Sequence, residues 1–64
     1  MIITERSDCH VSGCVRKEMY RCPDQPYYAV SIHRNSRPSY YGEFTDRDRA
    51  LHNFAVMFDL ARTV

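Results

Sequence analysis

Apolar and polar side chains alternate most regularly over residues 27–34, which is the pattern of a half-buried β-strand. Tyr28, Val30 and Ile32 fall on one face of this predicted strand, because successive side chains point to opposite sides. Aromatic and β-branched residues fit a pleated surface that is covered on one side. The opposite face, which we expect to be exposed, carries the residues in between: Tyr27, Ala29, Ser31 and His33.

Residues 14–22 and 39–44 show the same period of two and predict two further strands. Pro23 and Pro26 predict a break between the first two strands, because proline cannot donate a ladder hydrogen bond. The sequence Asn-Ser-Arg-Pro at 35–38 predicts the next turn. Gly42 lies within the third strand, where we expect a bulge or a close approach of the backbone.

Residues 46–62 predict one amphipathic helix. Thr45 is the expected N-cap, and Asp46 and Asp48 complement the positive end of the helix dipole. Apolar residues recur at steps of three and four, so that they form one face. We expect this face to pack on the sheet, and it comprises Ala50, Leu51, Phe54, Met57, Phe58 and Ala61.

These elements predict a single small α+β domain over residues 1–64. It has a three-stranded antiparallel sheet, formed by a β-meander over 14–44, with one C-terminal helix packed on one face. Residues 1–13 are either irregular or contain a short strand, since Ile2 and Ile3 can begin an extra N-terminal strand. A chain of about 60 residues buries only about 60% of its unfolded surface, so the core is small.

The formal net charge of +1 argues against a strongly basic nucleic-acid coat and against a strongly acidic DNA mimic. No apolar run approaches the roughly 20 residues that a bilayer requires. The first six residues do not resemble a signal peptide, so we expect a cytoplasmic protein with no membrane partner. The chain also has no Gly-rich phosphate loop, no HExxH and no GxSxG, and we expect no enzymatic activity.

Three cysteines without a signal peptide favour a reducing compartment. We expect no bound cofactor. The alternative is a tetrahedral zinc ion, although the spacing C-x4-C-x7-C has no CxxC knuckle to present two ligands from one turn. The other interpretation of these cysteines is structural, with Cys14 and Cys22 as small buried residues and Cys9 in a loop. The candidate zinc ligands are Cys9, His10, Cys14 and Cys22, with His33 as a substitute.

The segments Tyr-Tyr-Ala-Val-Ser-Ile-His-Arg at 27–34 and Tyr-Gly-Glu-Phe-Thr at 41–45, followed by Ala50 and Phe54, resemble the plant-type AP2 DNA-binding domain over residues 15–62. The resemblance implies a three-stranded sheet backed by one helix, and a DNA-binding module or small transcriptional regulator. That family reads the major groove with Arg and Trp on the exposed sheet face, where this chain has neither. The residues left for phosphate contacts are Arg16, Lys17, Arg21, Arg34 and Arg37.

In size and composition the chain is also similar to small phage-encoded inhibitors of the anti-CRISPR type, which share no motif. This resemblance implies docking on a host protein or nucleoprotein in a bacterial cytoplasm, which blocks nucleic-acid binding or activity. Tyrosine and arginine are enriched among the residues that dominate interface energies. We therefore expect the exposed sheet face and the 35–38 turn to bind the partner, through Tyr27, His33, Arg34, Arg37, Tyr41 and Glu43.

A second apolar stripe follows the predicted helix beside its core face. It comprises Val56, Leu60 and Val64, each four residues apart. A small domain leaves some apolar surface exposed, and such a stripe can equally be an interface with a partner or a second copy. The chain is accordingly expected to be a monomer or a homodimer.

Overall fold

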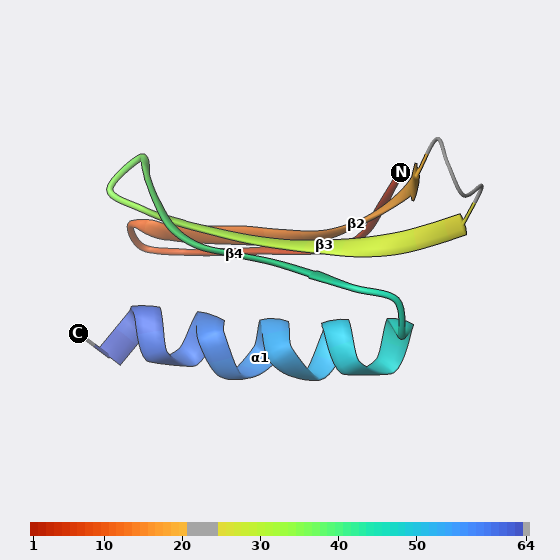
Figure 1. The fold of residues 1–64 in the computed structure, drawn as a ribbon. Helices are drawn as coiled ribbons and strands as arrows, with labels where there is room; N and C mark the ends of the chain where they lie inside the picture. Colours follow the sequence, from red (N-terminus) through yellow and green to blue (C-terminus); the bar gives the residue numbers. More distant parts are fainter. Residues whose placement is uncertain (21–24, 64) are drawn as a thin grey trace.

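The computed structural model describes residues 1–20 and 25–63, and it contains four strands and one helix in those ranges. Figure 1 shows the strands as one layer and the helix as a second layer beneath it. The elements are β1 (Ile2–Asp8), β2 (Val11–Tyr20), β3 (Gln25–Arg34), β4 (Arg37–Phe44) and α1 (Arg47–Thr63).

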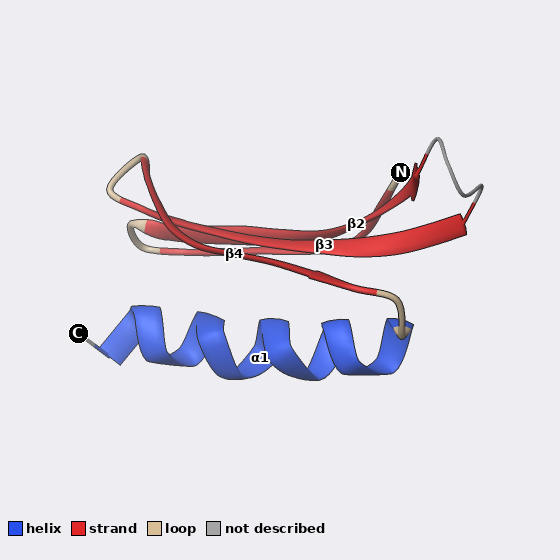
Figure 2. Ribbon diagram, in the orientation of Figure 1, coloured by secondary structure: helices blue, strands red, loops and turns tan. Residues whose placement is uncertain are grey.

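The four strands form one antiparallel sheet in the order β1-β2-β3-β4, so each strand pairs with its neighbours in the chain. The α+β class and the C-terminal helix expected from the sequence are confirmed. The optional N-terminal strand is present as β1, which makes the sheet four-stranded. The helix lies against β2 and β3 and touches β4 less, all on one face of the sheet (Figure 2).

The core lies between the helix and the central strands. It contains the inward residues expected on β3, Val30 and Ile32, which are fully buried. Tyr28, Tyr40 and Phe44 pack around this core with part of their surface exposed. The other buried members are Val11 and Val15 from β2 and Ala50, Phe54 and Phe58 from α1. The Phe54 and Phe58 rings are 5.7 Å apart at an interplanar angle of 57°.

The hairpin between β3 and β4 is tighter than the sequence suggested. Only Asn35 and Ser36 lie between the strands, and both have positive φ, at 53° and 64°. Two positive φ values define the type I′ turn that matches the twist of a hairpin, and asparagine tolerates that conformation. Pro38 therefore lies in β4, a sheet edge where a missing donor is tolerated.

Of the two alternatives expected at Gly42, the bulge occurs elsewhere, whereas a close approach is present, since the Tyr40 hydroxyl oxygen lies 2.6 Å from where a Cβ would be. Gly42 pairs regularly with Val30, whereas the register shifts between the pairs Ile32–Tyr40 and His33–Pro38. Ser39 lies at this shift.

β3 begins two residues earlier than predicted, at Gln25, so that Pro26 lies within the strand. Pro26 pairs with Met19 of β2, but the pairing of β3 with β4 starts only at Tyr28. The first residues of β3 are thus a sheet edge, where proline leaves no ladder bond unmade. Residues 21–24, which include Pro23 and Cys22, lie outside the described ranges.

The helix begins at Arg47, one residue later than a cap at Thr45 would require. Asp46 is the N-cap, because its Oδ1 accepts hydrogen bonds from the backbone N–H of Asp48 at 2.9 Å and of Arg49 at 3.4 Å. The assignment of the cap to Thr45 was therefore wrong. An aspartate satisfies the free N–H groups at least as well as a threonine and adds a negative charge at the positive end of the helix.

Two contacts hold the first strand to the helix. Arg62 of α1 donates a hydrogen bond to the Asp8 carboxylate of β1 at 2.7 Å. The Arg6 guanidinium carbon lies 4.5 Å from the centre of the Phe58 ring, which is a cation–π arrangement. These contacts place Arg6 and Asp8 on the helix side of β1. Glu5 and Ser7, which alternate with them along the strand, therefore lie on the opposite face of the sheet.

Candidate functional site

We use the term open face for the side of the sheet opposite α1. Residues paired across an antiparallel ladder share one face, and alternate residues along a strand return to it. The register therefore assigns its members: Ile2, Glu5, Ser7, Ser12, Cys14, Arg16, Glu18, Tyr20, Gln25, Tyr27, Ala29, Ser31, His33, Pro38, Tyr41 and Glu43. In the described part of the chain no other element packs against this face.

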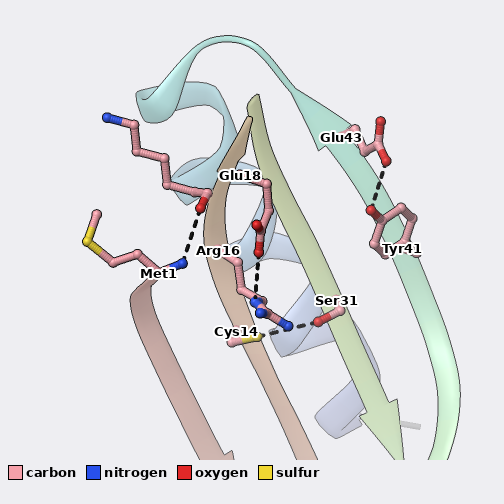
Figure 3. Close-up of polar contacts among 8 residues, drawn as sticks. Met1, Cys14, Arg16, Glu18, Ser31, Tyr41 and Glu43 are labelled. Atoms are coloured by element: carbon pink, nitrogen blue, oxygen red, sulfur yellow. Dashed lines mark hydrogen bonds and ion pairs between the residues drawn. The ribbon is translucent and has the colours of Figure 1, made fainter. Parts of the chain in front are cut away.

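Three tyrosines and one carboxylate form a linked cluster on the open face, and it spans three strands. The rings of Tyr20 on β2 and Tyr27 on β3 stack with their centres 4.3 Å apart. Tyr20 also donates its hydroxyl to Glu43 Oε1 at 3.1 Å. Tyr41 donates to the other oxygen of Glu43, Oε2, at 2.8 Å, as Figure 3 shows. We call Tyr20, Tyr27, Tyr41 and Glu43 the tyrosine cluster.

The carboxylate of Glu43 holds both hydroxyls in their protonated form. The hydrogen bond to Glu43 raises the pKa of Tyr41 to about 12, because ionised tyrosine would lose this bond and face a like charge. The same hydrogen bond raises the pKa of Tyr20. The two hydrogen bonds to Glu43 orient both tyrosine side chains before any partner arrives.

The cluster is accessible despite its internal bonds. Tyr41 is 60% exposed and Tyr20 is 37% exposed, whereas Tyr28 and Tyr40 pack against the core on the other face. The open face therefore presents aromatic area that the fold does not use. Aromatic rings of this kind provide large contact area at a low cost in conformational entropy.

The open face is negatively charged although the whole chain is not. It carries three carboxylates, Glu5, Glu18 and Glu43, against the single guanidinium of Arg16, which is a formal charge of −2 with His33 neutral. The chain as a whole carries +1, so the rest of it carries +3. Arg16 forms an ion pair with Glu18 at 3.2 Å, and both side chains remain partly exposed (Figure 3). The near-zero net charge of the chain thus conceals a negatively charged open face.

Beside the tyrosine cluster the open face is hollowed. The floor of this hollow consists of small side chains, since Ser12, Cys14 and Ser31 occupy adjacent positions of β2 and β3. The Cys14 sulfur and the Ser31 hydroxyl are 3.5 Å apart and are joined in Figure 3. Longer side chains, including those of Glu5 and His33, line the remainder of a space of about 560 Å³. We call this feature the serine hollow.

The structure brings together only part of the predicted partner-binding set. Tyr27, Tyr41 and Glu43 meet in the tyrosine cluster, and His33 lies on the same face beside the serine hollow. Arg34 and Arg37 do not join them. Arg34 pairs with both Val11 and Arg37, which places the two arginines on the helix side of the sheet.

Tyr20 was not among the residues predicted from the sequence to bind a partner. Tyr20 lies outside the 27–44 segment on which the interface was built, and its bond to Glu43 crosses 23 positions of the chain. The available signal was the parity of its strand. Tyr20 has the same parity as Arg16 and Glu18, which places it on the face opposite Val15.

The predicted zinc ligands are not gathered in the described ranges, where no group of three or more His, Cys, Asp or Glu residues could hold a metal ion. Cys9 is exposed in the turn between β1 and β2, next to His10, with φ of 57°. Cys14 is half-buried on the open face and is a free thiol, as is Cys9. Cys22 lies outside the described residues.

The apolar stripe of the helix is exposed. Val56 is 43% exposed and Leu60 is 54% exposed, while Val64 lies outside the described residues. Val56 and Leu60 each border a shallow depression between α1 and β4. Phe44 and His52 line the one beside Val56, and Tyr40 lines the one beside Leu60.

The fold and these surfaces define a small α+β domain, a four-stranded β-meander backed by one helix, with a bare aromatic and acidic sheet face. Comparison of the chain with protein-family models, with curated proteins and with solved structures finds no match. No helix among the described residues is long and apolar enough to cross a membrane.

Proposed function

We propose that this chain is a small non-enzymatic binding domain of the phage inhibitor type, which docks on a host protein or nucleoprotein through its open face. The observation that carries the proposal is the tyrosine cluster. Its rings are stacked and hydrogen-bonded on a surface that no described part of the chain covers. Side chains held in place before binding lose less entropy on association, which increases affinity.

A protein fits this face better than a nucleic acid does. The formal charge of −2 on the open face repels phosphate, whereas binding to nucleic acid depends mainly on neutralising phosphates. The candidate phosphate contacts Lys17, Arg34 and Arg37 register on the other side of the sheet. The DNA-binding alternative suggested by the AP2 resemblance therefore lacks a basic surface on the face that would read the groove.

A binding role also fits the chemistry of the open face better than catalysis. Its one thiol, Cys14, contacts the Ser31 hydroxyl. His33 lines the same hollow, but among the described residues it forms no hydrogen bond with this thiol, as activation by a base would require. The hydroxyls of Tyr20 and Tyr41 both donate hydrogen bonds to the Glu43 carboxylate. Such a domain inhibits a host protein by covering part of its surface, without modifying it chemically.

Capture from nuclease-treated bacterial lysate tests the proposal with a pair of matched variants. Tyr41→Ala removes a side chain from the tyrosine cluster, and Leu60→Ala removes one of similar exposure from the helix. We expect the wild type and Leu60→Ala to retain the same stoichiometric protein, and Tyr41→Ala to retain at least tenfold less. Circular dichroism confirms that each variant folds.

Three results would overturn the proposal. The first is equal capture by all three proteins, and the second is a loss of capture with Leu60→Ala alone. The third is recovery of nucleic acid with no stoichiometric protein, which would favour the DNA-binding alternative.

A further inference from the structure

The two outer strands of the sheet differ in how well their edges are protected. β1 and β4 each pair on one side only among the described residues. Natural proteins protect such edges with bulges, prolines and charged side chains, because unpaired backbone groups otherwise bind another strand. β1 has a register shift near its start and carries three charged residues. β4 has a proline and a register shift only in its first residues, before Tyr40.

The unprotected part of β4 has the sequence Tyr-Tyr-Gly-Glu-Phe at 40–44 and pairs regularly with β3. Its one charge is the Glu43 carboxylate, which already accepts hydrogen bonds from Tyr20 and Tyr41. In an antiparallel pair, residues that turn their N–H and C=O toward the partner strand alternate with residues that turn them away. Residues 40–44, which we call the β4 edge, therefore offer backbone donors and acceptors to one further strand.

The β4 edge is complementary to a second copy of itself. When two copies pair antiparallel about Gly42, Tyr41 lies opposite Glu43 of the second copy, and Tyr40 lies opposite Phe44 of the second copy. Two-fold symmetry forms each of these pairs twice. The Tyr41 hydroxyl can then donate to the carboxylate of either copy, and cross-strand aromatic pairs stabilise a sheet. No like charges lie directly opposite each other.

The β1 edge lacks this complementarity. Antiparallel pairing of two β1 strands about Glu5 or about Arg6 sets that charge directly opposite its own copy, which is destabilising. Pairing about Ser7 aligns Arg6 with Asp8 of the second copy, but the strand ends there and only residues 6–8 pair. Arg6 and Asp8 are also engaged within the chain, by Phe58 and Arg62 of the helix.

Pairing about Gly42 also covers apolar surface on the helix side of the sheet. Phe44 lines the depression that Val56 borders, and Tyr40 lines the one that Leu60 borders. Because Phe44 lies opposite Tyr40 of the second copy, the Val56 depression of one copy meets the Leu60 depression of the other. One arrangement therefore gives a partner both to the unpaired strand and to the exposed apolar stripe of the helix, where Val56 is 43% and Leu60 is 54% exposed.

We propose that the chain forms a symmetric dimer in which the two β4 edges pair antiparallel about Gly42. The two four-stranded sheets then become one continuous sheet, with both helices on the same side. The two open faces also join, so the dimer presents two tyrosine clusters on one surface. This inference goes beyond the proposed function and does not depend on it, because it concerns the chain alone.

Sedimentation velocity of the purified full chain measures the dimer, in a reducing buffer that prevents disulfide bonds between the free cysteines. We expect a monomer–dimer equilibrium that shifts toward the dimer as the protein concentration rises. Amide hydrogen exchange followed by NMR locates the interface. Alternate amides of residues 40–44 should exchange at least fivefold more slowly in the dimer than in the dilute monomer, while those of β1 stay unchanged.

Three variants test the alignment. Tyr41→Glu sets a second carboxylate opposite Glu43 of the other copy, so the dissociation constant of the dimer should rise at least tenfold. Adding Glu43→Lys to Tyr41→Glu sets opposite charges there and should restore most of the lost affinity. Ser7→Glu, the matched control, adds the same charge to exposed Ser7 on β1 and should change the dissociation constant less than twofold. Circular dichroism confirms that each variant folds.

Four results would overturn the dimer. They are a chain that stays monomeric at all concentrations, equal weakening by Ser7→Glu and Tyr41→Glu, exchange protection on β1 or α1 in place of residues 40–44, and a double variant as weak as Tyr41→Glu alone. A monomeric chain that still captures a host protein through Tyr41 would overturn only this inference. A dimer whose capture ignores Tyr41 would overturn only the proposed function.

Discussion

Gly13→Ala is expected to destabilise the domain, against the usual benefit of replacing a strand glycine. Gly13 lies on the helix side of β2, where the Phe54 ring packs against it. A Cβ at this position would lie 2.8 Å from Phe54 Cε1, 2.8 Å from the Ser31 carbonyl oxygen and 3.1 Å from Ile32 Cγ1. Ordinary contact begins at 3.4 Å, so the closest neighbours would have to move by about 0.6 Å.

The magnitude depends on which neighbour can move. The Ser31 oxygen belongs to the backbone of β3 and cannot shift without disturbing the ladder, and Phe54 is buried in the core. Overpacking of this kind costs about 1–3 kcal/mol. Removing glycine from a strand recovers about 0.5–1 kcal/mol. The midpoints of these two ranges leave a net loss of about 1 kcal/mol, which lowers the melting temperature of a domain this small by roughly 4–8 °C.

Thermal and urea unfolding followed by circular dichroism measure this effect, with Gly42→Ala as the control. A Cβ at Gly42 would lie 2.6 Å from the Tyr40 hydroxyl oxygen, which is the far end of a half-buried side chain and can move aside. Gly42→Ala should therefore cost less than Gly13→Ala. A Gly13→Ala protein as stable as the wild type, or a larger loss at Gly42, would refute the packing assigned to Gly13.

Three further perturbations have defined outcomes. Glu43→Gln should lower the pKa of Tyr41 from about 12 toward 10 in an ultraviolet titration, and an unchanged titration would refute the hydrogen bond between Tyr41 and Glu43. In the wild type, the stability that this hydrogen bond contributes should be lost between about pH 10 and pH 12. Asp46→Ala should cost about 1 kcal/mol in urea unfolding, while Thr45→Ala should cost much less, and the reverse order would restore Thr45 as the cap. Arg62→Ala removes an exposed, solvent-screened ion pair between α1 and β1, so it should change the urea midpoint much less than Asp46→Ala does, and an equal or larger change would show that this pair is not screened.

The sequence predicted the elements whose patterns are local. The alternation of Tyr28, Val30 and Ile32 identified the inward face of β3, and the 3–4 spacing around Phe54 and Phe58 identified the buried face of the helix. Both patterns reflect burial against one partner surface, which one segment of sequence can reveal.

The candidate site depended on pairings that no local pattern contains. The two-residue turn and the register of β3 with β4 turn Arg34 and Arg37 toward the helix side, although both lie next to residues of the open face. Tyr20 reaches Glu43 only because three strands lie side by side. The charge of −2 on the open face likewise appears only after the register assigns each side chain to a face.

Hydroxyl-radical footprinting of the chain, alone and bound to the protein it captures, tests the docking surface most directly. Tyr41 and Leu60 serve as matched reporters, because they are 60% and 54% exposed on different faces of the molecule. Docking through the open face predicts that the partner protects Tyr41 at least fivefold and leaves Leu60 unchanged. Protection of Leu60 with Tyr41 still fully reactive would contradict the account and assign docking to the helix.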